Sequence, residues 1–195
     1  MKIIHSTQAF DAGTSVTALG MFDGVHIGHQ ALIRRAVALS RQLDARCVVC
    51  TFDRHPLSVL CPRRAPEALL SLQENLEKFE ALGADYALVQ AFTPEYGATE
   101  PEAFLRQLVA ALRVRAIVAG ENYTFGAGGR GDAAMIRRLA PELGYRAEIV
   151  PPVMDGDTVC SSTWIRRLMA NGEAEHARRL MEIDGREAPL TERPH

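Results

Sequence analysis

The sequence predicts an α/β fold built on a doubly wound, mostly parallel sheet, and two observations carry this prediction. Short apolar runs recur along the chain, and segments with apolar residues at helical spacing separate them. Strands that alternate with helices are typical of a parallel sheet with helices on both faces. The chain has 195 residues, of which 47% are hydrophobic and 24% charged, and this is enough for one domain with a sizeable core.

The expected elements follow one another along the chain. Short, mostly apolar runs predict buried strands over residues 16–19, 46–52, 86–90, 116–119 and 146–150. Helical periodicity predicts helices over residues 31–39, 72–82, 101–112, 132–143, 163–170 and 173–181. A loop is expected over 53–57, followed by a proline- and arginine-rich segment over 61–66, and a mobile, glycine-rich loop is expected over 120–126 and on into 127–132. Residues 1–185 are predicted to form one domain, and residues 186–195 a polar tail that frays.

The net charge, the N-terminal residues and the lengths of the apolar runs exclude several classes of function. A net charge of -2 and a pI near 6.3 argue against binding to nucleic acid or to a membrane surface, but they leave small anions possible. The N-terminus lacks a signal-peptide pattern, and no apolar run approaches the roughly 18 residues that a spanning helix needs. We therefore expect a cytoplasmic protein, and the sequence does not indicate its oligomeric state.

Four cysteines, at positions 47, 50, 61 and 160, include a Cys-x-x-Cys pair at Cys47 and Cys50. This pair lies in a predicted strand, where residues three apart point to opposite faces of the sheet. The two thiols therefore cannot easily bind one metal ion or each other. The sequence predicts buried, reduced cysteines in preference to a metal site or a disulfide.

The run from Gly20 to Gln30, which contains His26-Ile-Gly-His29, lies where a predicted strand gives way to a predicted helix. The first N–H groups of a helix and the positive end of its dipole face an anion there, and glycines let a phosphate approach the main chain closely. Each imidazole can also donate a hydrogen bond to a phosphoryl oxygen. The pattern predicts a phosphate site. A zinc pair is the alternative, but zinc needs a further ligand and the sequence offers none nearby.

A second candidate phosphate site lies in Cys160-Ser-Ser-Thr-Trp-Ile-Arg166, at the start of another predicted helix. Ser161, Ser162 and Thr163 are all residue types that cap helix N-termini. Capping explains one hydroxyl, whereas three in a row followed by Arg166 one turn later favour a second cradle for phosphate.

Two further loops follow predicted strands. Gly120-Glu-Asn-Tyr-Thr-Phe-Gly126 is either part of a site or an ordinary glycine-rich surface connection, and the Arg-Gly-Asp tripeptide at 130–132 is treated as a coincidence. In the other loop, Pro56 restricts His55 to extended conformations and so aims its ring, although the pair is also consistent with a simple turn. Loops that follow parallel strands converge at the carboxyl edge of the sheet, near its topological switch point.

The chain resembles the adenylyltransferase module of prokaryotic bifunctional riboflavin kinase/FAD synthetases in four motifs. These motifs are Gly20 to His29, Thr51 to Pro56, Gly120 to Gly126 and Ser161 to Arg166. Their order and spacing match over about residues 14–182. The resemblance implies a Rossmann-like nucleotidyltransferase fold of the His-x-Gly-His type. It also implies an enzyme that makes FAD and pyrophosphate from FMN and ATP with Mg²⁺, by in-line attack of the FMN phosphate on the α-phosphate of ATP.

The resemblance assigns roles to individual residues. It implies catalytic roles for His26, His29 and Arg166. The residues that it implies bind ATP or phosphate are Gly20, Phe22, Asp23, Gly24, Gly28, Gly120, Asn122, Ser161, Ser162 and Thr163. The residues that it implies bind the flavin are Phe52, His55, Pro56 and Phe125. No protein metal site is expected, because Mg²⁺ is expected to be held mainly by phosphates.

Three features depart from the family pattern. Met21 replaces a common asparagine, Val159 stands where a basic residue can occur, and the chain stops at His195, too early to build a riboflavin kinase domain. Riboflavin phosphorylation is therefore not expected. Two other functions are weighed against the enzyme: a non-catalytic flavin- or nucleotide-binding module, and a nucleotidyltransferase acting on another phosphate monoester. The intact histidines, hydroxyls and Arg166 favour catalysis.

Overall fold

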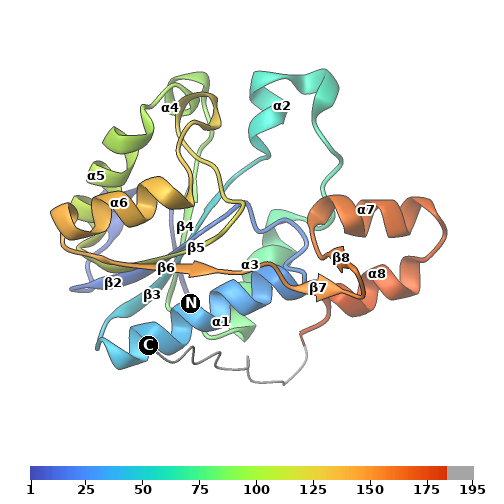
Figure 1. Cartoon of the computed structure of the whole chain (residues 1–195), viewed down its shortest axis with the longest axis horizontal. Helices are drawn as coiled ribbons and strands as arrows, with labels where there is room; N and C mark the ends of the chain where they lie inside the picture. The colour runs from blue at the N-terminus through green and yellow to red at the C-terminus, as the bar shows by residue number, and fades with distance from the viewer. Residues whose placement is uncertain (184–195) are drawn as a thin grey trace.

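The computed structural model describes residues 1–183 and confirms the predicted α/β architecture (Figure 1). One parallel sheet of six strands has the order β1-β4-β3-β2-β5-β6. Its strands are β1 Lys2–Ile4, β2 Ser15–Leu19, β3 Arg46–Phe52, β4 Tyr86–Gln90, β5 Val114–Gly120 and β6 Arg146–Val150. All five predicted strands are present. The predicted tail, 186–195, lies outside the described residues.

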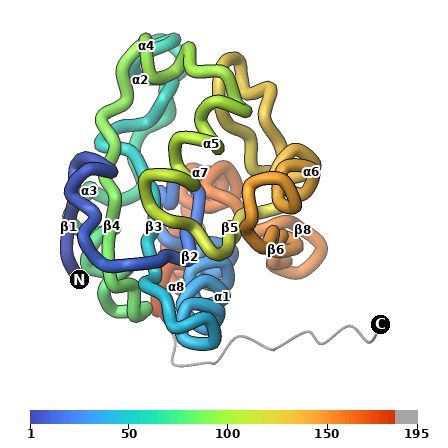
Figure 2. The backbone as a smooth tube through the Cα atoms, turned by 90° about the vertical axis from the view of Figure 1, so that its left-hand side faces the viewer, coloured from blue at the N-terminus to red at the C-terminus, as the bar shows by residue number. Residues whose placement is uncertain are grey.

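The helices cover both faces of the sheet (Figures 1 and 2). They are α1 Ile27–Gln42, α2 Pro56–Leu60, α3 Leu72–Ala81, α4 Pro94–Gly97, α5 Pro101–Leu112, α6 Ala133–Leu143, α7 Ser162–Ala170 and α8 Ala174–Met181. Side chains from α1 and α3, such as Ile33 and Phe79, form one core cluster with the sheet. Side chains from α5 and α6, such as Leu105 and Ile136, form the cluster on the other face. The sheet is therefore doubly wound, as predicted.

The order of the strands places the switch point between β2 and β5. From β2 the chain adds β3 and then β4 on one side, and it later adds β5 and then β6 on the other. All these strands are parallel, so the loops after β2 and β5 leave the same edge of the sheet on either side of the switch. Ligands bind in the crevice at this point of open α/β sheets.

Short elements escaped the sequence analysis. Strand β1 has three residues and pairs with β4, starting at Lys2 opposite Tyr86. Helices α2 and α4 are five and four residues long, and each begins at a proline. An antiparallel hairpin, β7 Met154–Asp155 and β8 Thr158–Val159, turns at Gly156 with φ 58°. Runs this short carry no periodicity, so only their tertiary partners reveal them.

The four cysteines are free, as the sequence analysis expected; Cys47 and Cys160 are buried, whereas Cys50 and Cys61 are partly exposed. Cys47 belongs to the core cluster on the α1 side of the sheet, whereas Cys50 packs against the cluster on the α5 side. Burial raises the pKa of the Cys47 thiol to about 12. The two thiols therefore lie on opposite faces of β3, as the strand period requires.

Helices α7 and α8 pack on each other beside the carboxyl edge, around a small apolar cluster that includes Ile165 and Leu168. Ile27 at the start of α1 and Leu69 pack against this cluster. The pair thus brings the N-terminus of α7 close to that of α1. No helix within residues 1–183 is long and apolar enough to cross a membrane.

Candidate active site

A cavity of about 310 Å³ opens at the switch point. The loops after β2, β5 and β6 converge on it, together with the N-terminus of α7. Of these, the β2 loop, the β5 loop and the start of α7 were expected at the site from the sequence. The predicted site residues that line it are Gly20, Phe22, His26, Gly28, His29, Gly120, Asn122, Ser161 and Ser162. Most of the predicted phosphate-binding residues therefore share one cavity of a size that suits a small-molecule ligand.

The turn between β2 and α1 has an unusual backbone. Phe22, Gly24 and Val25 all have positive φ, at 54°, 82° and 40°. Side chains other than glycine rarely adopt this region, so the turn is strained and must be held by its surroundings. The Phe22 ring supplies part of this support, since it is fully buried against Phe79. It also fills the space beside Gly20, where a Cβ would lie 2.8 Å from the ring. Gly20 is thus required by packing, whatever its role in binding.

Helix α1 begins at this turn without a side-chain cap. His26 occupies the N-cap position, and its side chain makes no capping hydrogen bond. The first N–H groups of a helix have no partner within the helix, and they carry the positive end of its dipole. The N–H groups of Ile27 and Gly28 point toward the Cys160 thiol, which lines the cavity. An anion in the cavity would therefore lie beside the positive end of the α1 dipole.

His26 and His29 stack on each other, with ring centroids 3.7 Å apart and an interplanar angle of 23°. The edge of Phe22 packs against His29 from another side, at 5.3 Å between centroids. Within residues 1–183, Nδ1 of each histidine is buried and has no hydrogen-bond partner. Buried polar atoms are normally paired, so two unpaired imidazole nitrogens beside one cavity indicate a site that a ligand completes.

Burial also sets the protonation state of the pair. It lowers the pKa of His26 from 6.5 to about 4. Burial lowers the pKa of His29 well below its ordinary value, and the neighbouring His26 lowers it further. Both rings are therefore neutral at neutral pH in the free protein.

This depressed pKa makes stability depend on pH. Between the unfolded pKa of 6.5 and the folded value of about 4, the unfolded chain binds more protons at His26 than the folded chain does. The free energy of unfolding is therefore expected to fall as pH falls through this window, by about 1.4 kcal/mol per pH unit for one such histidine. Urea unfolding at about pH 7 and about pH 5 measures this. The fall should be smaller in a His26→Ala variant, and an equal fall in both proteins would contradict the assignment.

The hydroxyls at the start of α7 divide their tasks. Ser161 caps the helix by accepting a hydrogen bond from the Trp164 N–H at 3.2 Å. Ser162 donates to the main-chain oxygen of Asp23 at 3.0 Å, and so ties α7 to the β2–α1 turn. Thr163 is exposed and does not line the cavity. The three hydroxyls, which were expected to act together, therefore differ. Ser161 caps the helix, Ser162 links it to the β2–α1 turn, and Thr163 is exposed.

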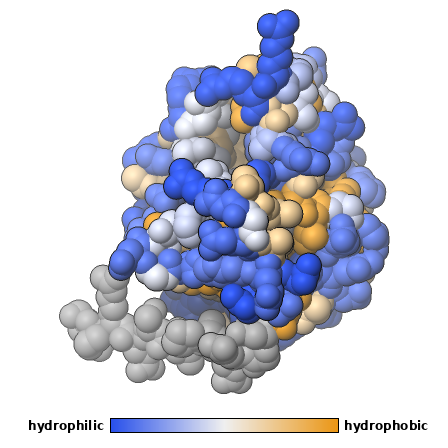
Figure 3. All heavy atoms as spheres, turned by 90° about the vertical axis from the view of Figure 1, so that its right-hand side faces the viewer, coloured by the Kyte–Doolittle hydropathy of each residue, from blue (hydrophilic) through white to orange (hydrophobic). Residues whose placement is uncertain are grey.

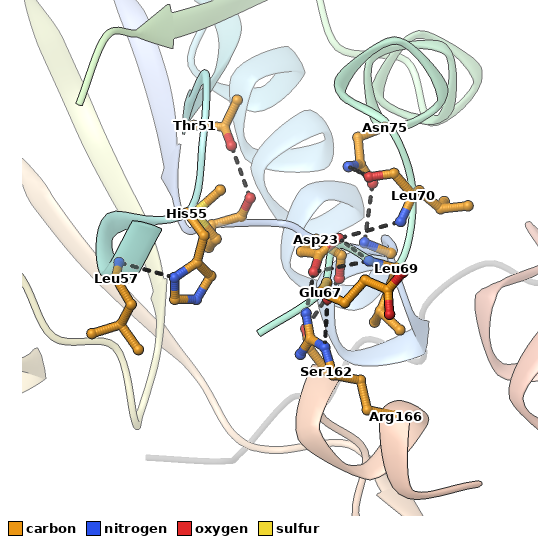
Figure 4. Close-up of polar contacts among 12 residues, drawn as sticks. Asp23, Thr51, His55, Leu57, Glu67, Leu69, Leu70, Asn75, Ser162 and Arg166 are labelled. Carbon is orange, nitrogen blue, oxygen red and sulfur yellow. Dashed lines mark hydrogen bonds and ion pairs between the residues drawn. The ribbon is translucent and has the colours of Figure 1, made fainter. Parts of the chain in front are cut away.

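Asp23 and Gly24 are not among the residues that line the cavity. Figure 4 shows the polar contacts that Asp23 makes instead. The Asp23 carboxylate accepts a hydrogen bond from the Leu69 N–H at 3.0 Å and forms an ion pair with Arg166. The Gly24 N–H donates to Asn75 Oδ1 at 3.1 Å. Both predicted phosphate-binding groups are therefore engaged by the protein itself, because their partners arrive from distant segments that the sequence motif does not show.

His55 lies at the start of α2, where Pro56 is the first helical residue. Its Nδ1 accepts a hydrogen bond from the Leu57 N–H at 3.1 Å, so the neutral ring carries its hydrogen on Nε2. Burial lowers the pKa of His55, and the nearby charge of Arg166 lowers it further, whereas Asp23 opposes this. His55, Arg166 and Asp23 therefore share one electrostatic neighbourhood, although none of them lines the cavity.

A chain of aromatic contacts links the two predicted flavin-binding rings. Phe52 packs on Tyr96, Tyr96 on Phe104, and Phe104 on Phe125. Phe125 stacks on Tyr123, which lines the cavity. Tyr96 and Tyr123 were not predicted from the sequence, although Tyr123 lies within the motif Gly120 to Gly126.

The glycine-rich loop that carries Phe125 makes several contacts with itself and with the start of α5. Main-chain hydrogen bonds of 3.0 and 2.9 Å join Phe125 and Gly131. Gly126, at φ 70°, lies so close to Pro101 that a Cβ would be 2.6 Å from its Cα. Arg130 pairs with Glu100. The loop is thus anchored to the start of α5.

The remaining wall of the cavity is mostly apolar. The residues that complete it and were not predicted are Leu19, Met21, Leu32, Glu121, Tyr123, Val150, Pro151, Pro152, Val153, Val159 and Cys160. On the face that carries α7 and α8, hydrophobic atoms gather in a patch amid a mainly hydrophilic surface (Figure 3). No group of His, Cys, Asp or Glu side chains within residues 1–183 is arranged to hold a metal ion.

Comparisons with known proteins match this site and fold. The FAD synthetase family matches residues 8–164. A bifunctional riboflavin kinase/FMN adenylyltransferase from Listeria monocytogenes serovar 1/2a (strain ATCC BAA-679 / EGD-e) is 37% identical over 187 residues, which are 93% of this chain and 59% of that protein. A relative from Geobacillus thermodenitrificans (strain NG80-2), whose name also contains riboflavin kinase/FMN adenylyltransferase, is 40% identical over 179 residues, 91% of this chain and 94% of its own.

Solved structures share the architecture. The crystal structure of a macrolide-efflux protein from Streptococcus pneumoniae matches with a TM-score of 0.79 at 29% identity, over 92% of this chain and 60% of that one. A pantoate-beta-alanine ligase from Francisella tularensis, complexed with beta-gamma ATP and beta-alanine, matches with a TM-score of 0.57 at 16% identity, over 94% and 78%. The second likeness concerns the fold alone. With residues 8–164 matched and relatives aligned over more than nine-tenths of its length, the chain belongs to the FAD synthetase family.

Proposed function

We propose that this protein transfers AMP from ATP to FMN, giving FAD and pyrophosphate. The stacked, neutral and unpaired histidines beside the uncapped end of α1 carry the proposal, because they form a site for phosphates at the switch point of the sheet. The names of the relatives support the choice of FMN as acceptor and ATP as donor.

The reaction is an in-line displacement. An oxygen of the FMN phosphate forms a bond to the α-phosphorus of ATP, and the bond from that phosphorus to the bridging oxygen breaks, releasing pyrophosphate. The FMN phosphate is already ionised near neutral pH, so the site needs no strong base. The work of the protein is to hold two anions together and to stabilise the charge that develops on the leaving oxygen.

His26 and His29 supply donors for that charge. Each neutral ring has one N–H, and the low-dielectric surroundings that keep the rings neutral also strengthen a hydrogen bond to a phosphoryl oxygen. The positive end of the α1 dipole, at Gly28, favours the negative charge of the phosphates at the same place. Gly20, Gly120 and Asn122 border the same cavity, which supports a role for them in binding the rest of the nucleotide.

Ser162 and Arg166 belong to α7, and His55 lies at the start of α2. We propose that the pyrophosphate portion of ATP binds near these residues, against Arg166. The aromatic chain from Phe52 to Phe125, in which Phe125 is buried, reaches the cavity through Tyr123, and this supports an apolar platform for the flavin there. Four free cysteines fit a reducing compartment, and the cytoplasm is the location that we propose.

Magnesium enters with the substrate. Mg²⁺ prefers oxygen ligands, whereas the cavity is lined by two imidazoles and one carboxylate, that of Glu121, and the Asp23 carboxylate is occupied by Arg166 and Leu69. We therefore propose that the ion is carried mainly on the phosphates of ATP. Excess EDTA is therefore expected to reduce FAD formation to background while leaving the urea midpoint of the ATP-free protein unchanged. A lowered midpoint in EDTA would reveal a structural metal and contradict this account.

The proposal is tested by incubating the protein with ATP, Mg²⁺ and either FMN or riboflavin, and separating the flavins by chromatography. FAD from FMN but not from riboflavin is the expected result. If FMN gives no FAD and another phosphate monoester is adenylylated, the acceptor is wrong. If ATP and FMN bind without any product, the protein is a binding module.

A further inference from the structure

Asp23 is a buried carboxylate that holds three segments of the chain together (Figure 4). Only 6% of the residue is exposed. Its side chain accepts hydrogen bonds from the Leu69 N–H at 3.0 Å and the Leu70 N–H at 3.4 Å. It pairs with Arg166 on α7, and its main-chain oxygen accepts the Ser162 hydroxyl. The β2–α1 turn, the segment before α3 and the start of α7 therefore meet at this one residue.

These contacts orient the guanidinium of Arg166. Its Nη2 bonds to the Asp23 carboxylate, and its Nε donates to the main-chain oxygen of Glu67 at 2.8 Å. The guanidinium is planar, so fixing Nε and Nη2 also fixes the direction of Nη1. No hydrogen bond among the described residues uses Nη1. Arg166 thus keeps two donors for an anion while its other edge is held.

A carboxylate surrounded by donors of the protein is poorly suited to bind phosphate itself. It carries the same charge as a phosphate, and its oxygens already accept two N–H groups and the guanidinium. The role of Asp23 must then come through the residues that it holds.

We propose that Asp23 is a positioning residue for Arg166, which it aims at the pyrophosphate portion of the substrate. This inference rests on the proposed function, because it takes Arg166 to contact that portion of ATP. Arg166 keeps its bonds to Asp23 and Glu67 when the anion binds, and Nη1 makes the new contact. Asp23 is therefore needed for the precise placement of the positive charge, although it touches no substrate.

Asp85 provides a matched control. Its carboxylate also accepts a main-chain N–H, from Cys47 at 2.8 Å, and pairs with two arginines, Arg41 at 3.0 Å and Arg46 at 3.6 Å. It lies just before β4, at the opposite end of the sheet from the cavity. An Asp85→Asn substitution therefore removes a comparable network without approaching the site.

The kinetic test is a double-mutant cycle on FAD formation with Asp23→Asn, Arg166→Ala and both together, beside Asp85→Asn. Asp23→Asn is expected to lower kcat by about 10- to 100-fold, the range typical of residues that orient a functional group. In the Arg166→Ala background the same substitution should change kcat less than about twofold. Asp85→Asn should leave kcat within about twofold of the natural value. Equal losses from Asp23→Asn in both backgrounds, or an equal loss from Asp85→Asn, would overturn the proposal.

Binding of inorganic pyrophosphate, measured by calorimetry, tests the same idea without catalysis. If Asp23 were only a negative charge near the anion, Asp23→Asn would strengthen binding. If Asp23 positions Arg166, the substitution should weaken binding by about tenfold, and this weakening should disappear in the Arg166→Ala background. Tighter or unchanged binding overturns the positioning role. Absence of FAD formation by the natural protein would instead refute the proposed function, and the two failures are thus separate.

Discussion

Replacing His26 or His29 by alanine is expected to lower kcat for FAD formation by about 100-fold or more, with the protein still folded. In the proposed mechanism each ring donates a hydrogen bond to the charge that develops on the leaving phosphate, and Nδ1 of each has no partner within residues 1–183. A buried polar atom without a partner costs free energy, so its removal offsets part of the packing that is lost with the ring. The effect should therefore fall on turnover more than on stability. Steady-state kinetics and urea unfolding measure the two quantities.

The control for this experiment is His5→Ala, because His5 is exposed near the N-terminus and does not line the cavity. That variant should keep the natural kcat and urea midpoint. If His26→Ala and His29→Ala lose stability in proportion to their loss of turnover, the rings are structural and the catalytic assignment fails.

Phe22→Ala is expected to reduce the free energy of unfolding by about 3–5 kcal/mol, the range for removing a large buried aromatic side chain. The ring is fully buried, packs on Phe79 at 5.6 Å and supports a turn that is held at positive φ. Its edge also contacts His29, so its loss should lower kcat as well. Urea unfolding and turnover at a temperature where the variant is folded give both values.

Phe79→Ala separates the two effects of Phe22. Phe79 is fully buried and belongs to the same core cluster, but it does not line the cavity. It should lose similar stability and retain more of the natural kcat than Phe22→Ala. Equal kcat in the two variants would contradict the claim that Phe22 supports His29.

The strands and long helices could be predicted from the sequence because their apolar residues repeat with a clear period. Strand β1 and helix α2 could not, since three to five residues contain no period and their conformation depends on partners. Lys2 is part of a strand because Tyr86 lies beside it in the sheet.

The residues of the site also include some that the sequence could predict and some that it could not. His26 and Gly28 were predictable from the motif, because the chemistry of a helix N-terminus is local. The roles of Asp23 and Gly24 were not, because their partners, Arg166 and Asn75, come from segments far away in the chain. A motif shows which residues occur together, whereas burial and partners decide which of them face the ligand.

The most direct test of adenylyl transfer uses ATP labelled with ³²P at either the α- or the γ-position, with FMN as acceptor. The proposed reaction places the α-label in FAD and the γ-label in pyrophosphate. A flavin that carries the γ-label, or an α-label that never leaves ATP while FMN is bound, would contradict the central claim.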